Sequence, residues 1–322
     1  MKKRISLLIS LLLILSMLLI PSMAIYNSSE SISFDNSEYS VGVVEKNFDT
    51  NIVESKVYSR NIVGNKNVET IESWTDITTN VITEAESFGV ETLASEVDTG
   101  GIIENDDRSI VNNTRKAPYS SIVYIEAKFK NSDKTYRFSG FLIADNIVVT
   151  AAHCLYDEGK GGWPTSITVK PGKDGELSMP YGLAKGRVAG VSTQWKETRD
   201  NNYDWGAIKT YHSFVGSPGK LSMATTPDNS EFSAEISGYP RQFPAGHNMY
   251  NQVHATGTAF TYNDYTIAYQ IDATNGQSGA PILDSNNIVR AIHSRGGTIC
   301  NYGARITPNV LYYLNEFVAE ND

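Results

Sequence analysis

The stretch Asn275-Gly276-Gln277-Ser278-Gly279-Ala280-Pro281 places one serine between two glycines, directly before a run that is typical of a strand. A nucleophilic serine needs a tight turn that exposes its hydroxyl, with backbone N–H groups aimed at a developing oxyanion. Glycine at position 276 allows that backbone conformation and the close approach of a substrate. A glycine-rich turn without a chemical role has the same appearance, so this stretch alone makes Ser278 only a candidate.

Two further stretches carry candidate partners for this serine. In Val148-Val149-Thr150-Ala151-Ala152-His153-Cys154, an apolar strand runs through small residues into a histidine. In Tyr203-Asp204-Trp205-Gly206-Ala207-Ile208-Lys209, an acid stands at the start of an apolar strand. Buried beside a histidine, such an acid fixes the imidazole tautomer and stabilises the imidazolium. Taken singly, His153 is equally explained as a core histidine and Asp204 as a strand cap.

The sequence around these stretches predicts an all-β fold. Gly, Pro, Asn and Asp clusters separate many short alternating or apolar runs, which predicts a sandwich or barrel. These runs cover residues 121–129, 136–144, 147–150, 166–170, 232–238, 252–260, 265–272, 280–283 and 288–293. The chain then ends on a helix, in which Thr307 is the cap and Pro308 suits the first turn. Its apolar face is expected to consist of Val310, Leu311, Leu314, Phe317 and Val318.

The first hundred residues differ from the rest. Residues 1–24 combine a basic start, an apolar run and the small residues Ser22 and Ala24, which predicts a signal peptide rather than a membrane anchor. Residues 25–100 hold 4 basic and 14 acidic residues and only short apolar clusters, so we expect a propeptide, partly ordered at best. A linker or surface-attachment region is the alternative. The peptidase-like part is then residues 101–322.

Charge and cysteine content exclude several functions. Residues 101–322 hold 20 basic and 22 acidic residues, so they offer no basic face for a nucleic acid. Cys154 and Cys300 are the only cysteines, and no HExxH or similar ligand spacing occurs. We therefore expect no catalytic metal and no cofactor. Stability has to come from a large core, which 222 residues can supply.

Together, the motifs resemble the glutamyl endopeptidase family of Gram-positive bacteria. The chain order of His153, Asp204 and Ser278 is that of the two-barrel serine peptidases. The resemblance covers residues 101–322 and rests on APYSSIVYI (117–125), VVTAAHCLYD (148–157), NYDWGAIK (202–209), ISGYP (236–240), NGQSGAPI (275–282), AIHSRGG (291–297) and GARIT (303–307). It implies a chymotrypsin-like double β-barrel with its C-terminal helix, divided near residue 212, and a zymogen that cleaves after glutamate and also aspartate.

The resemblance also implies a role for each matching residue. His153 is the general base, Asp204 orients it, Ser278 is the nucleophile, and the N–H groups of Gly276 and Ser278 form the oxyanion hole. His293 matches the histidine that the family places in its primary specificity pocket, where an imidazole can pair with a substrate carboxylate.

Two departures from the family pattern bear on specificity. Where the family commonly has a hydroxyl residue, five positions before the nucleophile, this chain has Ala273, and the neighbouring Thr274 is the candidate substitute. Asp272 occupies the place where trypsin-like enzymes hold the acid that selects Arg or Lys. A trypsin-like preference is therefore the alternative if Asp272 points into the pocket.

The remaining expectations concern processing and partners. Residues 101–108 resemble the family's mature N-terminus, so we expect an activating protease to cut near Gly101 and the freed amine to help complete the pocket. The family layout separates Cys154 and Cys300, so two free thiols are expected. We expect a secreted monomer that acts on protein or peptide substrates and has no membrane contact after signal removal. An inactive, peptide-binding homologue is the competing interpretation.

Overall fold

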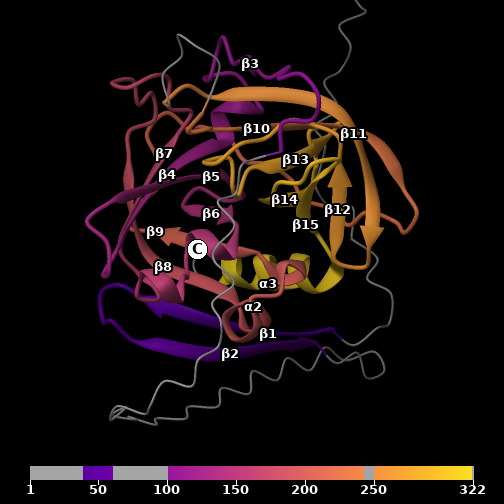
Figure 1. Cartoon of the computed structure of the whole chain (residues 1–322). Helices are drawn as coiled ribbons and strands as arrows, with labels where there is room; N and C mark the ends of the chain where they lie inside the picture. The colour runs from indigo at the N-terminus through magenta and orange to yellow at the C-terminus, as the bar shows by residue number, and fades with distance from the viewer. Residues whose placement is uncertain (1–38, 61–100, 243–249, 321–322) are drawn as a thin grey trace, which may run out of the picture. The chain divides into compact units, whose positions relative to one another are not determined.

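The first barrel carries the predicted histidine and aspartate. The computed structural model describes residues 39–60, 101–242 and 250–320. Six antiparallel strands are hydrogen-bonded in the order β8-β7-β4-β5-β6-β9, and a β8–β9 pairing closes them into a barrel (Figure 1). These strands are β4 (Ile122–Phe129), β5 (Thr135–Leu142), β6 (Ile147–Thr150), β7 (Pro164–Pro171), β8 (Ala184–Ser192) and β9 (Gly206–Thr210).

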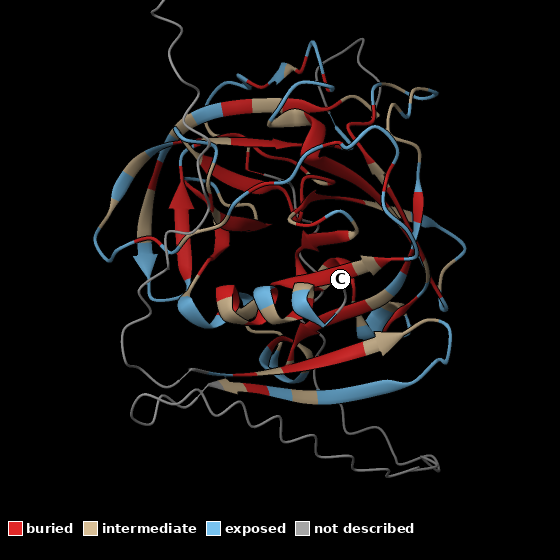
Figure 2. Cartoon of the chain, turned by 180° about the vertical axis from the view of Figure 1, so that it is seen from behind, coloured by how far each residue is buried: buried red, intermediate tan, exposed pale blue. Residues whose placement is uncertain are grey.

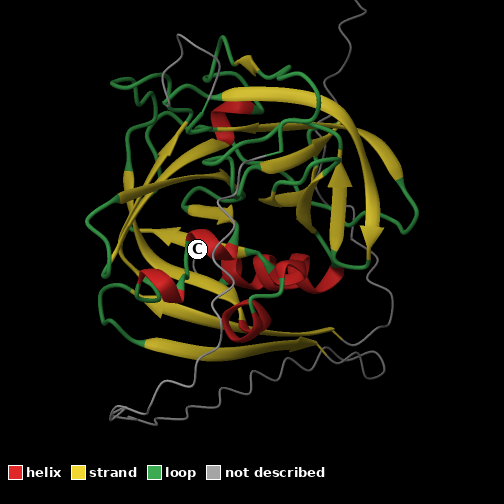
Figure 3. Cartoon of the chain, in the orientation of Figure 1, coloured by secondary structure: helices red, strands yellow, loops and turns green. Residues whose placement is uncertain are grey.

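The second barrel carries the predicted nucleophile and is closed in the same way, in the order β10-β13-β14-β15-β12-β11 with a β10–β11 pairing. Its strands are β10 (Glu231–Gly238), β11 (Val253–Asn263), β12 (Thr266–Tyr269), β13 (Pro281–Asp284), β14 (Val289–Arg295) and β15 (Asn301–Arg305). The expected all-β double barrel is confirmed, and strands dominate the described chain in Figure 3.

Two segments pack on the barrel formed by the other half of the chain, across the expected division near residue 212. The short strand β3 (Ser109–Ile110) pairs with β11 of the second barrel, so the expected mature N-terminus lies along that barrel. The helix α3 (Pro308–Ala319), capped by Thr307 as expected, joins the core of the first barrel. Its buried face includes Tyr313, which the pattern did not predict and which packs on Trp205 with ring centroids 5.3 Å apart.

Of the expected propeptide, the structure describes residues 39–60. A hairpin of β1 (Tyr39–Asn47) and β2 (Val53–Arg60) extends the sheet of the first barrel through antiparallel pairing of β1 with β8. Figure 2 shows β1 largely buried and β2 largely exposed. The sequence predicted partial order for residues 25–100 but not this hairpin. The expected signal peptide, residues 1–24, lies outside the described residues.

Short helices and loops complete the first barrel. The helix α2 (Thr193–Thr198) follows β8 directly, and its N-terminus is capped by Ser192, whose Oγ accepts a hydrogen bond from Trp195 N–H at 3.0 Å. Four 3-10 helices occur in the described chain: η1 (Tyr119–Ser121), η2 (Ala152–Cys154), η3 (Glu158–Lys160) and η4 (Asn201–Tyr203). The triad candidates His153 and Asp204 lie in η2 and directly after η4.

Candidate active site

Ser278 lies in a turn between β12 and β13 that only glycines could make. Gly276 has φ +101° and Gly279 has φ +86°, a region that residues with a side chain rarely adopt. A Cβ on Gly279 would also lie 2.1 Å from Thr150 Oγ1 and 2.3 Å from Ser139 O. The turn is thus pressed against β5 and β6, which brings the serine of the second barrel to the wall of the first.

Ser139 of β5 holds this turn from the first barrel. Its N–H donates to Ser278 O at 2.9 Å. Its hydroxyl donates to Gly276 O at 2.9 Å and accepts from Tyr239 N–H at 2.8 Å. In the described part of the chain, neither the N–H group of Gly276 nor that of Ser278 has a hydrogen-bond partner. That arrangement is the one an oxyanion hole requires.

The second component is a histidine–aspartate pair within the first barrel, in which Asp204 is buried and the side chain of His153 is 28% exposed. The backbone N–H of His153 donates to Asp204 Oδ1 at 2.9 Å, and Nδ1 of the ring lies 2.7 Å from Oδ2. These two contacts fix both the main chain and the ring of the histidine. An Nδ1–H that donates to the carboxylate leaves Nε2 as the ring's proton acceptor.

Ser294, on β14 of the second barrel, also holds the carboxylate. Its hydroxyl donates to Asp204 Oδ2 at 2.6 Å, and both side chains are buried. Burial alone would raise the pKa of Asp204, but the charge of His153 and the hydrogen bonds from His153 and Ser294 hold it below its ordinary value. Asp204 therefore stays ionised in its buried position.

The electrostatics of the pair also act on the histidine. Burial lowers the pKa of His153, but the opposing charge of Asp204 outweighs it and sets the pKa well above its ordinary value. The rings of Phe138 and Trp195 flank the imidazole, with centroids 6.2 Å and 6.3 Å from its own. The imidazolium that would form in a proton transfer is therefore stabilised by its aspartate.

The serine and the histidine lie on adjoining segments without a direct hydrogen bond. Cys154, the residue after His153, donates through its Sγ to Ser278 O at 3.8 Å. Among the described residues, no hydrogen bond joins Ser278 Oγ to His153. Such contacts commonly tighten only when a substrate is bound, so this geometry is compatible with the expected triad.

His293 lies directly beside the turn that holds Ser278. Its carbonyl accepts from Gly279 N–H and its N–H donates to Ala280 O, both at 2.8 Å. The imidazole is 1% exposed, and its Nδ1 is hydrogen-bonded to the hydroxyl of Tyr269. The strand β14 therefore carries, in two successive residues, the specificity candidate and the serine that binds Asp204.

Asp272 and Thr274 are engaged by the expected mature N-terminus. Asp272 accepts from the N–H of Ile103 at 2.6 Å through Oδ1 and from the N–H of Asp107 at 3.0 Å through Oδ2. The hydroxyl of Thr274 donates to Gln242 O at 3.0 Å and accepts from Arg108. Both side chains are buried, and both are occupied in holding neighbouring backbone or side-chain groups.

Arg108 is a site residue that sequence reasoning missed. Its side chain is 2% exposed, pairs with Asp106 at 2.8 Å, and donates to Gln277 Oε1 at 3.0 Å and Gln242 O at 3.1 Å as well as to Thr274. One guanidinium thus fastens the segment of residues 106–108 to the segment just before Ser278. Nothing local in the sequence Asp106-Asp107-Arg108 signals this contact.

Ser294 and Ser139 were also missed as site residues. The one available signal for Ser294 was its position directly after the specificity candidate His293. No local signal pointed to Ser139, because Tyr239 lies 100 positions and Gly276 lies 137 positions further along the chain. The cysteines behave as expected: Cys154 and Cys300 are buried and unpaired with each other.

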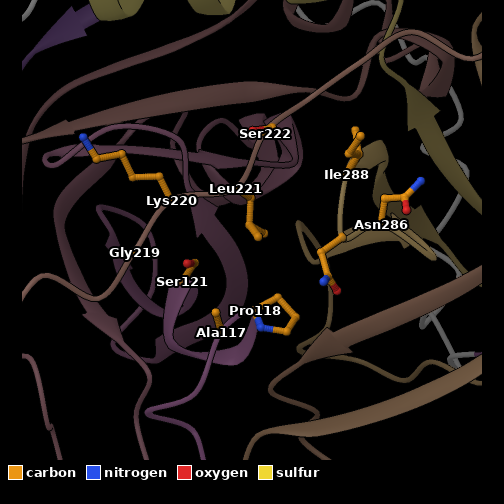
Figure 4. Close-up of a pocket in the computed structure, with 10 residues that line it drawn as sticks. Ala117, Pro118, Ser121, Gly219, Lys220, Leu221, Ser222, Asn286 and Ile288 are labelled. Carbon is orange, nitrogen blue, oxygen red and sulfur yellow. The ribbon is translucent and has the colours of Figure 1, made fainter. Parts of the chain in front are cut away.

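A surface pocket lies apart from these residues. It has a volume of about 250 Å³ and is lined by residues 117–118, 121, 219–222 and 286–288, with none of the predicted site residues among them (Figure 4). Among the residues described, no group of three or more His, Cys, Asp and Glu is placed to hold a metal ion. No helix within the described ranges is long and apolar enough to cross a membrane.

Comparison with known proteins identifies the family. The trypsin family model matches residues 110–319, which is more than half of the chain. The chain belongs to the trypsin family. This serine protease is 31% identical over 228 residues to a glutamyl endopeptidase of Bacillus licheniformis, covering 67% of this chain and 68% of the relative. The resemblance to glutamyl endopeptidases is therefore confirmed.

Two further comparisons each match about two-thirds of this serine protease. It is 34% identical over 225 residues to a Bacillus subtilis protein named extracellular metalloprotease, covering 67% of this chain and 70% of that one. A solved structure of a Glu endopeptidase in complex with MPD matches 68% of this chain and 99% of its own, with 27% identity and a TM-score of 0.61. Both matches span about two-thirds of the chain.

Proposed function

We propose that this serine protease is a secreted endopeptidase that cleaves after glutamate, and also after aspartate, through an acyl-enzyme on Ser278. One observation carries the proposal. The turn that holds Ser278 packs against the segment that holds His153, and His153 is hydrogen-bonded to Asp204. The same turn keeps the N–H groups of Gly276 and Ser278 without an internal acceptor. These are the parts that acyl transfer needs in one place.

The residues perform the reaction in two halves. Ser278 Oγ attacks the scissile carbonyl carbon while its proton passes to Nε2 of His153. The N–H groups of Gly276 and Ser278 bind the oxyanion, and loss of one such donor typically costs about 10²–10³ in turnover. The imidazolium then protonates the leaving amine, which departs and leaves the acyl-enzyme. Water attacks this ester, gives its proton to His153, and the serine leaves with that proton.

Preference for an acidic side chain is supported by where the polar groups point. His293 lies beside the nucleophile turn, and its imidazole can donate to a substrate carboxylate or pair with it when protonated. Both oxygens of Asp272 are already bound to the N–H groups of Ile103 and Asp107. These contacts favour a glutamyl preference over the trypsin-like alternative, because an acid that selects Arg or Lys has to offer its carboxylate to the substrate.

Processing near Gly101 is supported by the environment of that residue. Gly101 is buried, and its carbonyl accepts from Ala273 N–H at 3.2 Å and from Asn301 Nδ2 at 2.7 Å. A new amino terminus formed there would lie beside the segment that precedes Ser278. We propose that a separate protease makes this cut, and that the product acts outside the cell as a monomer on protein and peptide substrates.

The test is a map of cleavage sites. The processed protein digests a denatured protein mixture, and mass spectrometry identifies every cut, with Ser278→Ala as the control. We expect cuts after Glu, with fewer after Asp, all absent in the control. Cuts after Lys or Arg would keep the triad but transfer the specificity to Asp272. No Ser278-dependent cutting by processed material would leave a binding protein on a peptidase fold.

A further inference from the structure

The hairpin of β1 and β2 completes an open edge of the first barrel. β7 pairs with β8 only at Ala184 and Lys185. β1 pairs with β8 from Val188 to Ser192, and Phe48 N–H donates to Arg187 O at 2.8 Å. The part of the β8 edge that β7 leaves unpaired is therefore paired with β1, which lies before the expected cleavage site (Figure 1). Addition of a strand to an open edge is a common mode of peptide recognition.

The hairpin shares its apolar core with the peptidase domain. Val41, Val43, Val44 and Tyr58 are each less than a tenth exposed and belong to the same buried cluster as the first barrel and α3. The ring of Tyr58 packs edge-on against Tyr313 of α3, with centroids 5.4 Å apart. The hairpin thus packs on both β8 and α3, and its removal would uncover apolar surface on both elements.

The shape of β8 fits this packing. Gly190 lies beneath both partners, since a Cβ there would come within 2.2 Å of the Tyr313 hydroxyl and 3.2 Å of Glu45 Cγ. Any larger residue would separate the helix or the hairpin from the strand. The mature domain therefore has a surface, formed by β8 and α3, that is shaped to take this segment.

Polar contacts hold the hairpin at two places. At its turn, Asp49 pairs with Arg187 at 2.9 Å and accepts a hydrogen bond from the Tyr211 hydroxyl. On β2, Lys56 pairs with Glu320 at 3.1 Å, and the Tyr58 hydroxyl donates to Glu320 at 2.9 Å. Each contact joins a propeptide residue to a residue of the mature domain.

The buried acid Glu45 is matched within the hairpin. Its carboxylate pairs with Lys56 at 2.9 Å and lies 3.1 Å from the Tyr58 hydroxyl, whose one proton it shares with Glu320. Burial of a carboxylate costs free energy unless the group is paired and hydrogen-bonded, and both partners of Glu45 come from β2. The hairpin therefore supplies its own partners for the one carboxylate that it buries against the domain.

The hairpin lies clear of the catalytic residues. Within the described chain, the hydrogen bonds, ion pairs and ring contacts of residues 39–59 involve neither His153, Asp204, Ser278 nor His293. Its neighbours are β8, α2 and α3. A segment with these contacts supports the folded domain without filling the position of a substrate.

From these contacts we infer that residues 39–60 form a docking module that stays bound to the β8–α3 surface after the chain is cut near Gly101. The inference rests on the proposed processing but not on catalysis. The bound module completes the β8 edge and leaves the Ser278 site open. The occupant of the β8–α3 surface in the processed protein is thus the chain's own propeptide.

The first experiment uses the full chain with Ser278→Ala, cut by an added protease near Gly101 and passed through gel filtration with mass spectrometry. We expect the fragment that contains residues 39–60 to co-elute with the mature domain at micromolar concentration. Val43→Asp, at a fully buried position, should release it, with at least tenfold weaker binding. Val57→Asp, at a position 53% exposed on the same hairpin, is the matched control and should retain it.

A second experiment avoids variants that fail to fold. A labelled synthetic peptide of residues 39–60 is exchanged into the processed Ser278→Ala protein and followed by fluorescence anisotropy. The unlabelled wild-type and Val57→Asp peptides should compete, whereas the Val43→Asp peptide should compete at least tenfold less well. Separation of the wild-type fragment, or equal competition by both variant peptides, would overturn the inference. Because Ser278→Ala is inactive throughout, these results are independent of the proposed peptidase activity.

Discussion

Replacement of Ser294 by alanine tests whether the second barrel supports the triad through Asp204. The hydroxyl donates to Asp204 Oδ2 at 2.6 Å, and the aspartate keeps two other donors, both from His153. Hydrogen bonds to charged groups contribute about 1.5–3 kcal/mol. Because two donors remain, we expect the lower part of that range, which corresponds to a loss of roughly tenfold in kcat.

The loss of this donor also predicts a shift in pH dependence. Oδ2 of Asp204 is shared between Ser294 and Nδ1 of His153, so without the serine its charge acts more strongly on the imidazolium. The pKa of His153 should rise, and the acid limb of kcat/KM should move to higher pH. KM should change little, because Ser294 reaches the substrate only through Asp204.

The assay is steady-state cleavage of a glutamyl peptide by processed protein between pH 5 and 9. Ser237→Ala is the matched control, because Ser237 is buried on β10 and donates to Val253 O at 3.0 Å without touching the triad. We expect the control to stay within about twofold of wild type. Identical kcat and pH profiles for the two variants would refute the reasoning.

Three further predictions follow from the same contacts. Gly279→Ala should reduce kcat by more than about 10²-fold at retained secretion, since a Cβ there meets Thr150 Oγ1 at 2.1 Å and displaces the nucleophile; a kcat within fivefold of wild type would contradict this. Arg108→Met should lower the free energy of unfolding by about 1–3 kcal/mol, measured in urea, and lower kcat. Arg108→Lys should rescue neither, because one ammonium cannot replace the guanidinium fork. The rate of inactivation by a neutral organophosphate should rise with pH through a midpoint above about 6.5, because the raised pKa of His153 keeps the base protonated below it; a midpoint below 6 would contradict that shift.

The catalytic chemistry was predictable because its signals are local. A serine between glycines, a histidine after a strand and an aspartate before one each occupy a few adjacent residues. The order of His153, Asp204 and Ser278 along the chain then predicted a fold of two barrels. The strand Ile147–Thr150 was predicted with its observed limits, since three β-branched apolar residues and a threonine follow the turn signal Asp145-Asn146.

The supporting contacts were not predictable in the same way. Ser294 and Asp204 are 90 positions apart, and Arg108 and Gln277 are 169 apart. Such pairings depend on how the barrels close, which no local pattern encodes. β8 was also missed, because Ala184–Ser192 begins with alternating small and charged residues and continues with small residues and two valines, without large apolar side chains. The hairpin at 39–60 packs on β8 and α3. Its own composition therefore did not predict that these residues form two paired strands.

Covalent labelling of the processed protein tests the central claim most directly. A fluorophosphonate probe is added to wild type and to Ser278→Ala, and the modified residue is identified by mass spectrometry. The account predicts one adduct, on Ser278, that is absent from the variant. Labelling at another residue, or no labelling of material shown to begin near Gly101, would contradict the assignment of Ser278 as an activated nucleophile.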